Sequence, residues 1–396
     1  MWIVRNAESL FDRLNATHPI VAVVGPRQAG KTTFLKQQMQ KKQASHYVTL
    51  DDLSAKTLFD QETPEKFEQQ YLDRSRINVL DEVQYGLHPG IKLKHWADQG
   101  YKLWISSSSQ RLLESSVLSY LAGRVGLLPL YGFDLGEYLL VKNQKAYTQS
   151  TLEQVIWEHA VYGSYPHACL TPGPEDKKLI LKNLFTTVLL KDTFVTFGVQ
   201  DQSTLIRLSR YLAVNSACEL NYRTAAQAVG ISIPTLHKYL EALEKSYLVQ
   251  RVQPFFTNKN LELVKQPKVY FVDTGMRNAV LDEFPNDLTA HGRLFENYLY
   301  SELVKLGYSP QYWKNKNNAE VDFIVHRRGR PVPIEVKLFS EANVSRSLRS
   351  FIEKYAPSTA YVACYQGEEK TLKIGETPVR FLHPDHLLDR LKTPES

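Results

Sequence analysis

Residues 20–32 read IVAVVGPRQAGKT, an apolar run followed by two glycines, a lysine and a hydroxyl residue. The spacing from Gly25 to Thr32 fits GxxxxGK[ST], the P-loop pattern, in full. Gly25 and Gly30 permit backbone angles that turn successive N–H groups inward, and such groups form a nest for an anion. The helix expected after the loop adds the positive end of its dipole. The stretch therefore predicts a phosphate site on a strand–loop–helix unit.

Two side chains of this loop have specific roles in such a site. Lys31 can reach the β- and γ-phosphates, and Thr32 offers a hydroxyl to Mg²⁺. A chance glycine turn is the alternative, but the complete motif between an apolar strand and a helical pattern argues against it. The sequence therefore predicts ATP and Mg²⁺ as ligands. The residues expected around the phosphates are Gly25, Pro26, Arg27, Gln28, Ala29, Gly30, Lys31, Thr32 and Thr33.

Acidic and hydroxyl residues end two further apolar runs. RINVLDEVQ, at 76–84, leads to Asp81 and Glu82. In P-loop enzymes the first acid sits near the metal and the second can polarise the attacking water; the alternative is that both acids cap the next helix. ISSSSQ, at 105–110, is expected at the tip of the fourth strand, where a polar side chain lies between the metal and the γ-phosphate. Ser108 is the candidate for that position.

The first 130 residues alternate between short apolar runs and helical patterns. This alternation predicts an α/β fold with a parallel sheet covered on both faces. LAGRVG places Arg124 just before the fifth strand. A lone arginine is usually a solvated surface group, but this position also suits an arginine finger that acts on the nucleotide of a neighbouring subunit. The expected strands are 20–24, 46–50, 77–80, 102–106 and 125–130.

Length and composition limit the classes of protein to which this chain can belong. At 396 residues, 43% hydrophobic and 23% charged, the chain predicts two or three globular domains. No apolar run approaches the roughly 20 residues of a membrane span, and the N-terminus does not read as a signal peptide. Three widely spaced cysteines without a CxxC pair disfavour structural zinc and a disulfide framework, so a reducing cytoplasm is the expected compartment. The net charge of +6 permits a polyanionic partner.

GPRQAGKTT, VLDEVQ and LAGRV, in this order and spacing, resemble the AAA+ ATPases. The resemblance is closest to a prokaryotic family that joins such a module to a C-terminal domain of unknown function. It extends over nearly the whole chain, with GSYPHACL, VYFVDTGMRN and EVDFIV…PIEVK as further landmarks. It implies an ATP-driven machine that assembles into a ring, expected to be a hexamer. The sequence differs from that family at the tip of the fourth strand. Members of the family usually carry a glycine–serine pair there, whereas this chain has only serines.

Residues 204–265 read as a winged helix: helix, turn, helix and wing. Gly230 suits a helix C-terminus, Ser232 can cap the next helix, and Leu236, Leu240 and Leu243 share its buried face. The stretch holds eight basic and four acidic residues, a local excess of +4. DNA binding, mainly through the phosphate backbone, is one reading and packing against protein is the other. The candidate DNA contacts are Thr235, Lys238 and Arg251.

Acidic residues also converge in the last hundred residues. Glu335 and Lys337 are two apart and project from one face of a strand, and a short hairpin can bring Asp322 beside Glu335. Two or three carboxylates and a lysine can hold Mg²⁺ and activate a water for phosphodiester cleavage. The pattern resembles the PD-(D/E)xK restriction-endonuclease-like core, with Glu296 as the helix acid. Domains of this kind also occur without nuclease activity, as DNA-binding or structural domains. The ExK pattern alone is weak evidence, because it occurs on many surface strands.

Together these patterns predict an ATP-hydrolysing DNA motor or remodeller that acts in repair or recombination, with branched or broken DNA as candidate substrates. Two alternatives are a nucleotide-switched binding protein without motor activity and an ATP-regulated, Mg²⁺-dependent nuclease. The expected domains are an AAA+ core at 1–132, a helical lid at 133–203, the winged helix at 204–265 and the nuclease-like domain at 266–396.

Overall fold

The chain divides into two compact units in the computed structural model. One unit comprises residues 1–133 with 245–247, and the other comprises residues 134–244 with 248–396. Each unit is described by itself below. The structure describes residues 2–42, 46–109, 119–143, 146–189, 193, 201–256 and 265–392.

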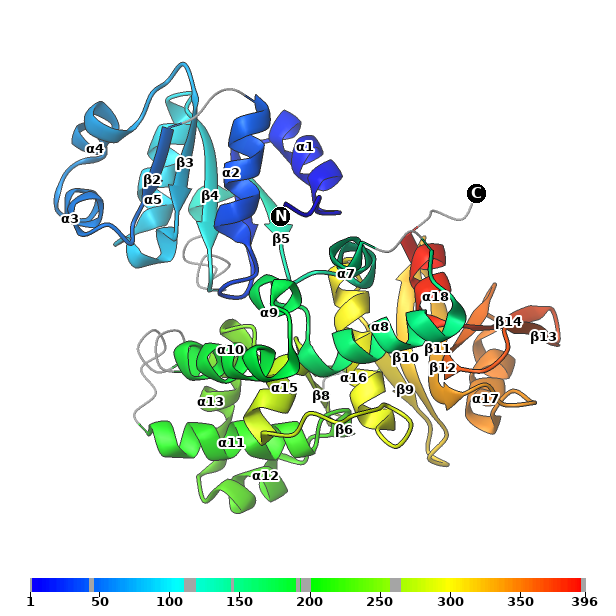
Figure 1. Cartoon of the computed structure of the whole chain (residues 1–396). Coiled ribbons are helices and arrows are strands. Elements are labelled where there is room, and N and C mark those ends of the chain that lie inside the picture. Colours follow the sequence, from blue (N-terminus) through cyan, green and yellow to red (C-terminus); the bar gives the residue numbers. More distant parts are fainter. Residues whose placement is uncertain are drawn as a thin grey trace. The chain divides into compact units, whose positions relative to one another are not determined.

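The first unit is built on a five-stranded parallel sheet (Figure 1), which confirms the predicted α/β class. The strand order is β2-β3-β4-β1-β5, so β1, which leads into the P-loop, lies between β4 and β5. Each predicted strand agrees with an observed one to within a residue at either end. The strands are β1 (Ile20–Val24), β2 (His46–Thr49), β3 (Ile77–Asp81), β4 (Lys102–Ser107) and β5 (Val125–Pro129).

Helices cover both faces of this sheet, which explains why β1 is apolar throughout. Val21 and Val23 pack with Phe11 and Phe34 of the first two helices, whereas Ala22 and its even-numbered neighbours face the opposite cluster. Alternate side chains of a strand point to opposite faces of the sheet. Because both faces are buried here, every residue of β1 lies in an apolar environment. The helices are α1 (Glu8–Thr17), α2 (Lys31–Lys42), α3 (Leu53–Gln61), α4 (Pro64–Tyr71), the 3₁₀ turn η1 (Val83–Tyr85) and α5 (Pro89–Asp98).

The second unit begins with helices and a small antiparallel sheet. The pattern predicted for the helix–turn–helix is confirmed: Leu236, Leu240 and Leu243 are fully buried, and Gly230 closes its helix in the left-handed conformation. The sheet order is β6-β8-β7. The helices are α7 (Leu135–Lys142), α8 (Gln149–Tyr162), α9 (Pro166–Leu170), α10 (Pro174–Thr187), α11 (Gln202–Val214), α12 (Tyr222–Val229), α13 (Ile233–Lys245) and α15 (Thr274–Leu281). The strands are β6 (Cys218–Glu219), β7 (Val249–Val252) and β8 (Lys268–Phe271).

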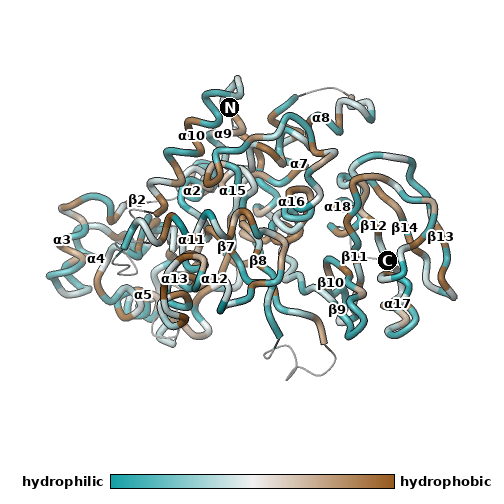
Figure 2. Tube along the Cα trace, turned by 90° about the horizontal axis from the view of Figure 1, so that it is seen from below, coloured by the Kyte–Doolittle hydropathy of each residue, from teal (hydrophilic) through white to brown (hydrophobic). Residues whose placement is uncertain are grey.

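A six-stranded mixed sheet, ordered β13-β14-β12-β11-β10-β9, completes this unit. Strands β9, β10 and β11 are antiparallel neighbours, and β12 runs parallel to both β11 and β14. Figure 2 shows hydrophobic residues along β12, which is buried in the middle of the sheet. The elements are α16 (Gly292–Lys305), β9 (Gln311–Lys314), β10 (Glu320–Arg327), β11 (Arg330–Phe339), α17 (Arg346–Tyr355), β12 (Ala360–Gln366), β13 (Lys370–Ile374), β14 (Thr377–Leu382) and α18 (Pro384–Lys392).

Two features of this unit bear on the sites below. The hairpin between β10 and β11 turns at Arg328 and Gly329, both with positive φ, as a tight two-residue hairpin requires. One hydrophobic core includes residues from Leu135 to Leu391, so the helices and sheets of this unit pack into a single body. Within the described ranges, none of the helices is both long enough and apolar enough to cross a membrane.

Candidate functional site

The P-loop is formed at the end of β1, and α2 begins at Lys31. A Cβ atom on Gly25 would lie 2.0 Å from the carbonyl oxygen of Leu130, so only glycine fits there. Gly30 has a φ of 92°, a region that favours glycine. The ammonium group of Lys31 is buried and donates to the carbonyl oxygens of Gly25 and Pro26, at 3.1 and 2.9 Å. Loop, lysine and helix N-terminus are thus gathered in one place.

Asp81 lies beside the loop and accepts three side-chain hydrogen bonds. Its Oδ2 accepts from the hydroxyls of Thr32 and Tyr47, both at 2.7 Å, and its Oδ1 accepts from Ser106. Burial and the hydrogen bond to Asp81 raise the pKa of Tyr47. A threonine hydroxyl and a carboxylate are hard oxygen donors, the type that Mg²⁺ prefers. The two residues predicted to bind the metal therefore lie in contact and fit that ion.

Glu82 adopts an unusual backbone conformation next to Asp81. Its φ of 56° lies in the left-handed region, where non-glycine residues are uncommon and often functional. Its N–H donates to Ser106 Oγ at 2.9 Å, and its Oε2 accepts from Ser108 Oγ at 2.9 Å. The Gln84 amide also donates to Ser108 Oγ, at 2.9 Å. The structure thus joins Glu82 directly to Ser108, the serine chosen from the run of four.

Ser106 and Tyr47 belong to this cluster and were missed by the sequence analysis. The signal for Ser106 was present in the serine run, because residues two apart on a strand share a face. Ser106 and Ser108 both face the acids, whereas Ser107 donates instead to the carbonyl oxygen of Ser109, at 2.9 Å. Nothing in the sequence marks Tyr47, since its contact depends on β2 pairing with β3.

Arg5 is a second residue that sequence patterns did not identify. It is 7% exposed and donates to the carbonyl oxygens of Ala29, Tyr131 and Gly132, at 3.2, 2.7 and 3.0 Å. Its guanidinium also lies 5.1 Å from the centre of the Phe133 ring. Arg5 therefore links the P-loop to the last residues of the first unit.

Arg124 lies at the other end of the sheet from the P-loop. Its carbonyl oxygen accepts from the N–H of Ile20, the first residue of β1, whereas the loop follows the last residue. Five strand residues separate the two points by about 16 Å. The Arg124 side chain forms an ion pair with Asp98, Nε to Oδ1, at 2.6 Å. This placement puts Arg124 away from the nucleotide site of its own chain.

The predicted DNA contacts have unequal surroundings. Lys238 is exposed on α13. The hydroxyl of Thr235 lies 2.8 Å from that of Ser232, the residue that caps this helix. Arg251 is instead held within the module: its Nε and Nη2 donate to the two carboxylate oxygens of Glu244, at 2.8 and 2.5 Å. Arg251 thus already has a full charge partner, because β7 places it over the C-terminal half of α13.

The C-terminal acids are brought together in part. Asp322 Oδ2 accepts from the N–H of Val336 at 2.8 Å, and burial followed by the charge of Glu296 raises the pKa of Asp322 well above its usual range. Glu335 is buried, accepts from the Ser345 hydroxyl at 2.7 Å and lies 3.3 Å from Lys337 Nζ. The hairpin thus places Asp322, Glu335 and Lys337 as predicted from the strand periodicity.

Glu296 departs from the metal-site prediction. Its Oε1 accepts from Lys268 Nζ at 3.1 Å and from the Tyr270 hydroxyl at 2.6 Å. Burial lowers the pKa of Lys268, but the charges of Glu296, Asp322 and Glu320 outweigh burial and raise it. Across the part of the chain that the structure describes, no three or more His, Cys, Asp or Glu residues are grouped to hold a metal ion. Glu296 thus has Lys268 of β8 as its charge partner, and the possible Mg²⁺ site of two or three carboxylates stays a prediction.

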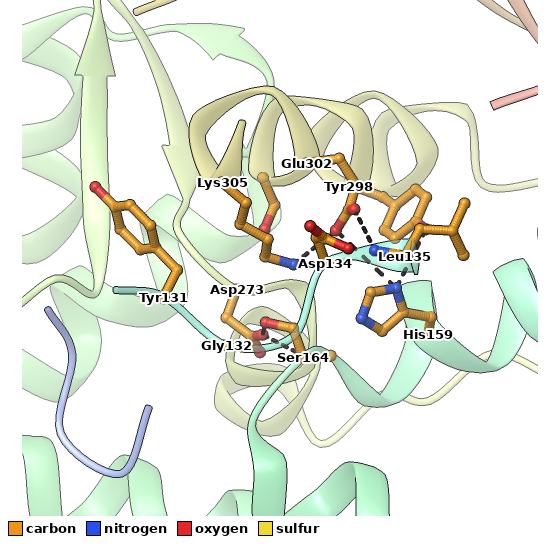
Figure 3. A network of polar contacts seen from close by, with 12 residues as sticks. Tyr131, Gly132, Asp134, Leu135, His159, Ser164, Asp273, Tyr298, Glu302 and Lys305 are labelled. Atoms are coloured by element: carbon orange, nitrogen blue, oxygen red, sulfur yellow. Dashed lines mark hydrogen bonds and ion pairs between the residues drawn. The ribbon is translucent and has the colours of Figure 1, made fainter. Parts of the chain in front are cut away.

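Two landmark motifs of the second unit meet in a buried polar network (Figure 3). The N–H and hydroxyl of Ser164, from GSYPHACL, both donate to Asp273 Oδ2 of VYFVDTGMRN at 2.7 Å. A Cβ on Gly163 would lie 2.2 Å from Asp273, so glycine is required at this approach. Nearby, Glu302 accepts from the N–H of Leu135 at 2.7 Å and pairs with Lys305 at 2.6 Å. These residues are buried, and their contacts indicate that the two motifs serve to pack the second unit.

Comparison with known proteins divides the chain into three matched regions. Residues 17–139 match the family model of an AAA domain, whereas residues 153–287 and 291–381 match two domains of unknown function, DUF8612 and DUF4143. An uncharacterized protein of Mycobacterium tuberculosis is 26% identical over 357 residues, which cover 87% of this chain and 76% of that protein. An uncharacterized protein of Methanocaldococcus jannaschii is 24% identical over 349 residues, covering 84% and 78%.

Among solved structures, the Walker-type ATPase of Pyrococcus abyssi is similar to this chain. The TM-score is 0.48 at 14% identity, over 71% of this chain and 96% of that one. The family match agrees with the complete P-loop, the parallel sheet and the acid pair after β3. The chain therefore carries an N-terminal P-loop ATPase domain of the AAA class, followed by regions that match domains of unknown function.

Proposed function

We propose that this protein hydrolyses ATP and that the site formed by residues 25–33, Asp81, Glu82 and Ser108 carries the reaction. The observation that supports it most strongly is the chain of hydrogen bonds from Thr32 to Asp81, on to Ser106, and from Ser108 to Glu82. Such a chain fixes the metal-side and water-side acids relative to each other before substrate arrives. Phosphoryl transfer depends on positioning and on electrostatic stabilisation, so a fixed arrangement of this kind suits it.

Each group has a separate part in this proposal. Thr32 and Asp81 would hold Mg²⁺, and the bound ion would neutralise part of the negative charge on the phosphates. Lys31 donates to loop carbonyls and would turn its ammonium group to the β- and γ-phosphates. Glu82 orients the attacking water, and Ser108 holds the Glu82 carboxylate in place by its hydrogen bond.

The proposal is tested by steady-state ATP hydrolysis and nucleotide binding on the full chain. Lys31→Ala should lose nucleotide binding, whereas Glu82→Gln should keep binding and lose turnover. Lys36→Ala, on the same helix but outside the motif, is a matched control and should keep both. Turnover at the wild-type rate in Glu82→Gln would remove Glu82 from the water-orienting role.

The wider assignment is that ATP turnover drives a DNA motor or remodeller, in repair or recombination and in the cytoplasm. The exposed Lys238 and the local charge excess of +4 favour contact with a phosphate backbone. A nucleotide-switched binder is the alternative, and an ATP-regulated nuclease would in addition need a working C-terminal site. Hydrolysis measured with single-stranded, duplex and junction DNA separates the first two, because only a motor turns over many ATP molecules when DNA is added.

The proposal includes assembly into a ring, expected to be a hexamer, and the place of Arg124 supports it. An arginine about 16 Å along the sheet from its own P-loop can serve as a finger only in a neighbouring site. Arg124→Ala should keep ATP affinity and lose most turnover, and mixing it with Glu82→Gln protein should restore part of the activity at hybrid interfaces. Asp98→Asn, which removes the ion-pair partner, is the control and should stay active. A fully active Arg124→Ala protein would exclude the finger role.

A further inference from the structure

We propose that Lys268 serves as a built-in cation of the C-terminal acid cluster and closes this site to divalent metal ions. The cluster consists of Glu296, Glu320, Asp322 and Glu335. The inference concerns a site separate from the P-loop and does not depend on the proposed ATPase function. It disagrees with the magnesium chemistry implied by the resemblance to PD-(D/E)xK nucleases, and four observations carry it.

The first observation is the position of the ammonium group. Lys268 is 3% exposed, and its Nζ lies 3.1 Å from Glu296 Oε1 and 2.5 Å from Glu320 Oε1. It thus bridges the acid of helix α16 and the first acid of strand β10. Glu320 and Asp322 are two apart on that strand, so the ammonium group lies on the face where a metal bound to Asp322 would have to enter.

The second observation is the set of other charges that face the cluster. Lys337 lies 3.3 Å from Glu335, and Lys314 lies 3.7 Å from Glu320 and also pairs with Glu219. Three ammonium groups therefore lie among the four carboxyl groups of the cluster, and two of them, Lys314 and Lys337, also pair with Glu219 and Glu341 outside it. A divalent cation would meet these positive charges at short range, where the repulsion is least screened.

The third observation is the hydrogen bonding of the helix acid. The same Glu296 oxygen that meets Lys268 also accepts from the buried hydroxyl of Tyr270, at 2.6 Å. To ligate a metal through this oxygen, Glu296 would have to leave both partners. Loss of a charged hydrogen bond in a buried site leaves the donor unpaired, and this opposes the exchange.

The fourth observation is the rigid support of the strand that supplies the lysine. The carboxamide of Asn297 accepts from the N–H of Phe271 at 2.9 Å and donates to its carbonyl oxygen at 2.7 Å. Ser301 donates to the carbonyl oxygen of Val272 at 2.8 Å. Helix α16 is thus fixed to the end of β8, and this holds the backbone positions of Lys268 and Glu296 close to each other.

Manganese binding to the nucleotide-free full chain tests the proposal, with Mn²⁺ titration followed by electron paramagnetic resonance. The wild type should show no site that depends on Asp322. Lys268→Ala should gain one, with an increase in Mn²⁺ affinity on the order of tenfold or more. The double variant Lys268→Ala/Asp322→Asn should lose it again. Lys314→Ala is the matched comparison and should raise Mn²⁺ affinity less than Lys268→Ala, because Lys314 pairs with the same Glu320 but is about one-third exposed, so that solvent screens its charge.

Two results would overturn the proposal. One is a Mn²⁺ site in the wild type that disappears in Asp322→Asn. The other is a folded Lys268→Ala protein, verified by circular dichroism, that binds Mn²⁺ no better than the wild type. If Lys268→Ala does not fold, Lys268→Met removes the charge but keeps an apolar side chain of similar length and all four acids, and it should show the same gain; its failure to do so would count equally against the proposal.

Discussion

Ser106 occupies a central position in the nucleotide site, although only its hydroxyl group is involved. It donates to Asp81 and accepts from the N–H of Glu82, so it holds both acids from one atom. Ser108 holds only the Glu82 side chain. At the scale of single residues, the two serines should therefore differ in what their removal changes.

We expect Ser108→Ala to lower the turnover of ATP by about tenfold to a hundredfold with little loss of stability. Ser106→Ala should lower turnover as well and also destabilise the first unit, by about 1–3 kcal/mol, because the N–H of Glu82 is left without its acceptor. Ser107→Ala is the control for turnover, since Ser107 faces away from the acids and bonds the backbone of Ser109 instead. Hydrolysis rates and thermal unfolding of the three variants measure both effects. Equal turnover in the Ser106 and Ser107 variants would contradict this assignment.

The cysteines provide a residue-scale test of the second unit. Burial raises the pKa of the Cys169 thiol to about 12 and that of Cys364 to about 11. Cys218 is half-exposed. Because the thiolate is the reactive form, iodoacetamide at pH 8 should modify Cys218 in the folded protein and the other two only after unfolding. Mass spectrometry of the alkylated peptides measures this, and rapid labelling of Cys169 in the native state would argue against the packing of α9.

At the scale of elements, the region predicted as a winged helix holds two candidate DNA contacts with different surroundings, the exposed Lys238 and Arg251, which pairs with Glu244. Lys238→Ala should weaken DNA binding and reduce the slope of affinity against salt by about one unit, because one phosphate contact is lost. Arg251→Ala should chiefly lower stability, by about 1–3 kcal/mol, because Glu244 loses a bidentate partner. Binding titrations at several salt concentrations separate the two. An equal loss of slope in both variants would show that Arg251 leaves Glu244 to contact DNA.

Local patterns predicted elements well and contacts between elements poorly. The strands of the parallel sheet follow from apolar runs, and the buried face of α13 follows from leucine spacing, because both signals lie within a few residues. Lys268 and Glu296 are 28 positions apart and meet only because β8 packs against α16. Arg5 reaches residues 131 and 132 across the length of the first unit. No short-range periodicity encodes such pairs, so the structure was needed to find them.

At the scale of the whole molecule, the P-loop belongs to one of two units with separate cores. A ligand stabilises only the folded region that binds it, by about 2.7 kcal/mol at a hundredfold excess over its Kd. In calorimetry, Mg²⁺ with a non-hydrolysable ATP analogue should therefore raise the midpoint of one transition and leave the other in place. Lys31→Ala should abolish the shift. A common shift of all transitions would mean that the two units unfold as one.

The three carbonyl contacts of Arg5 have a practical consequence for anyone who trims this protein for expression. The region that matches the AAA family model starts at residue 17, which makes that position an attractive place to cut. A protein cut there would lose Arg5 and also Phe11, whose ring is fully buried against Phe34 and Trp104. The P-loop sequence would be intact, yet one face of its sheet would be uncovered. An insoluble or inactive fragment of this kind would report on the missing first helix and not on the chemistry of the site.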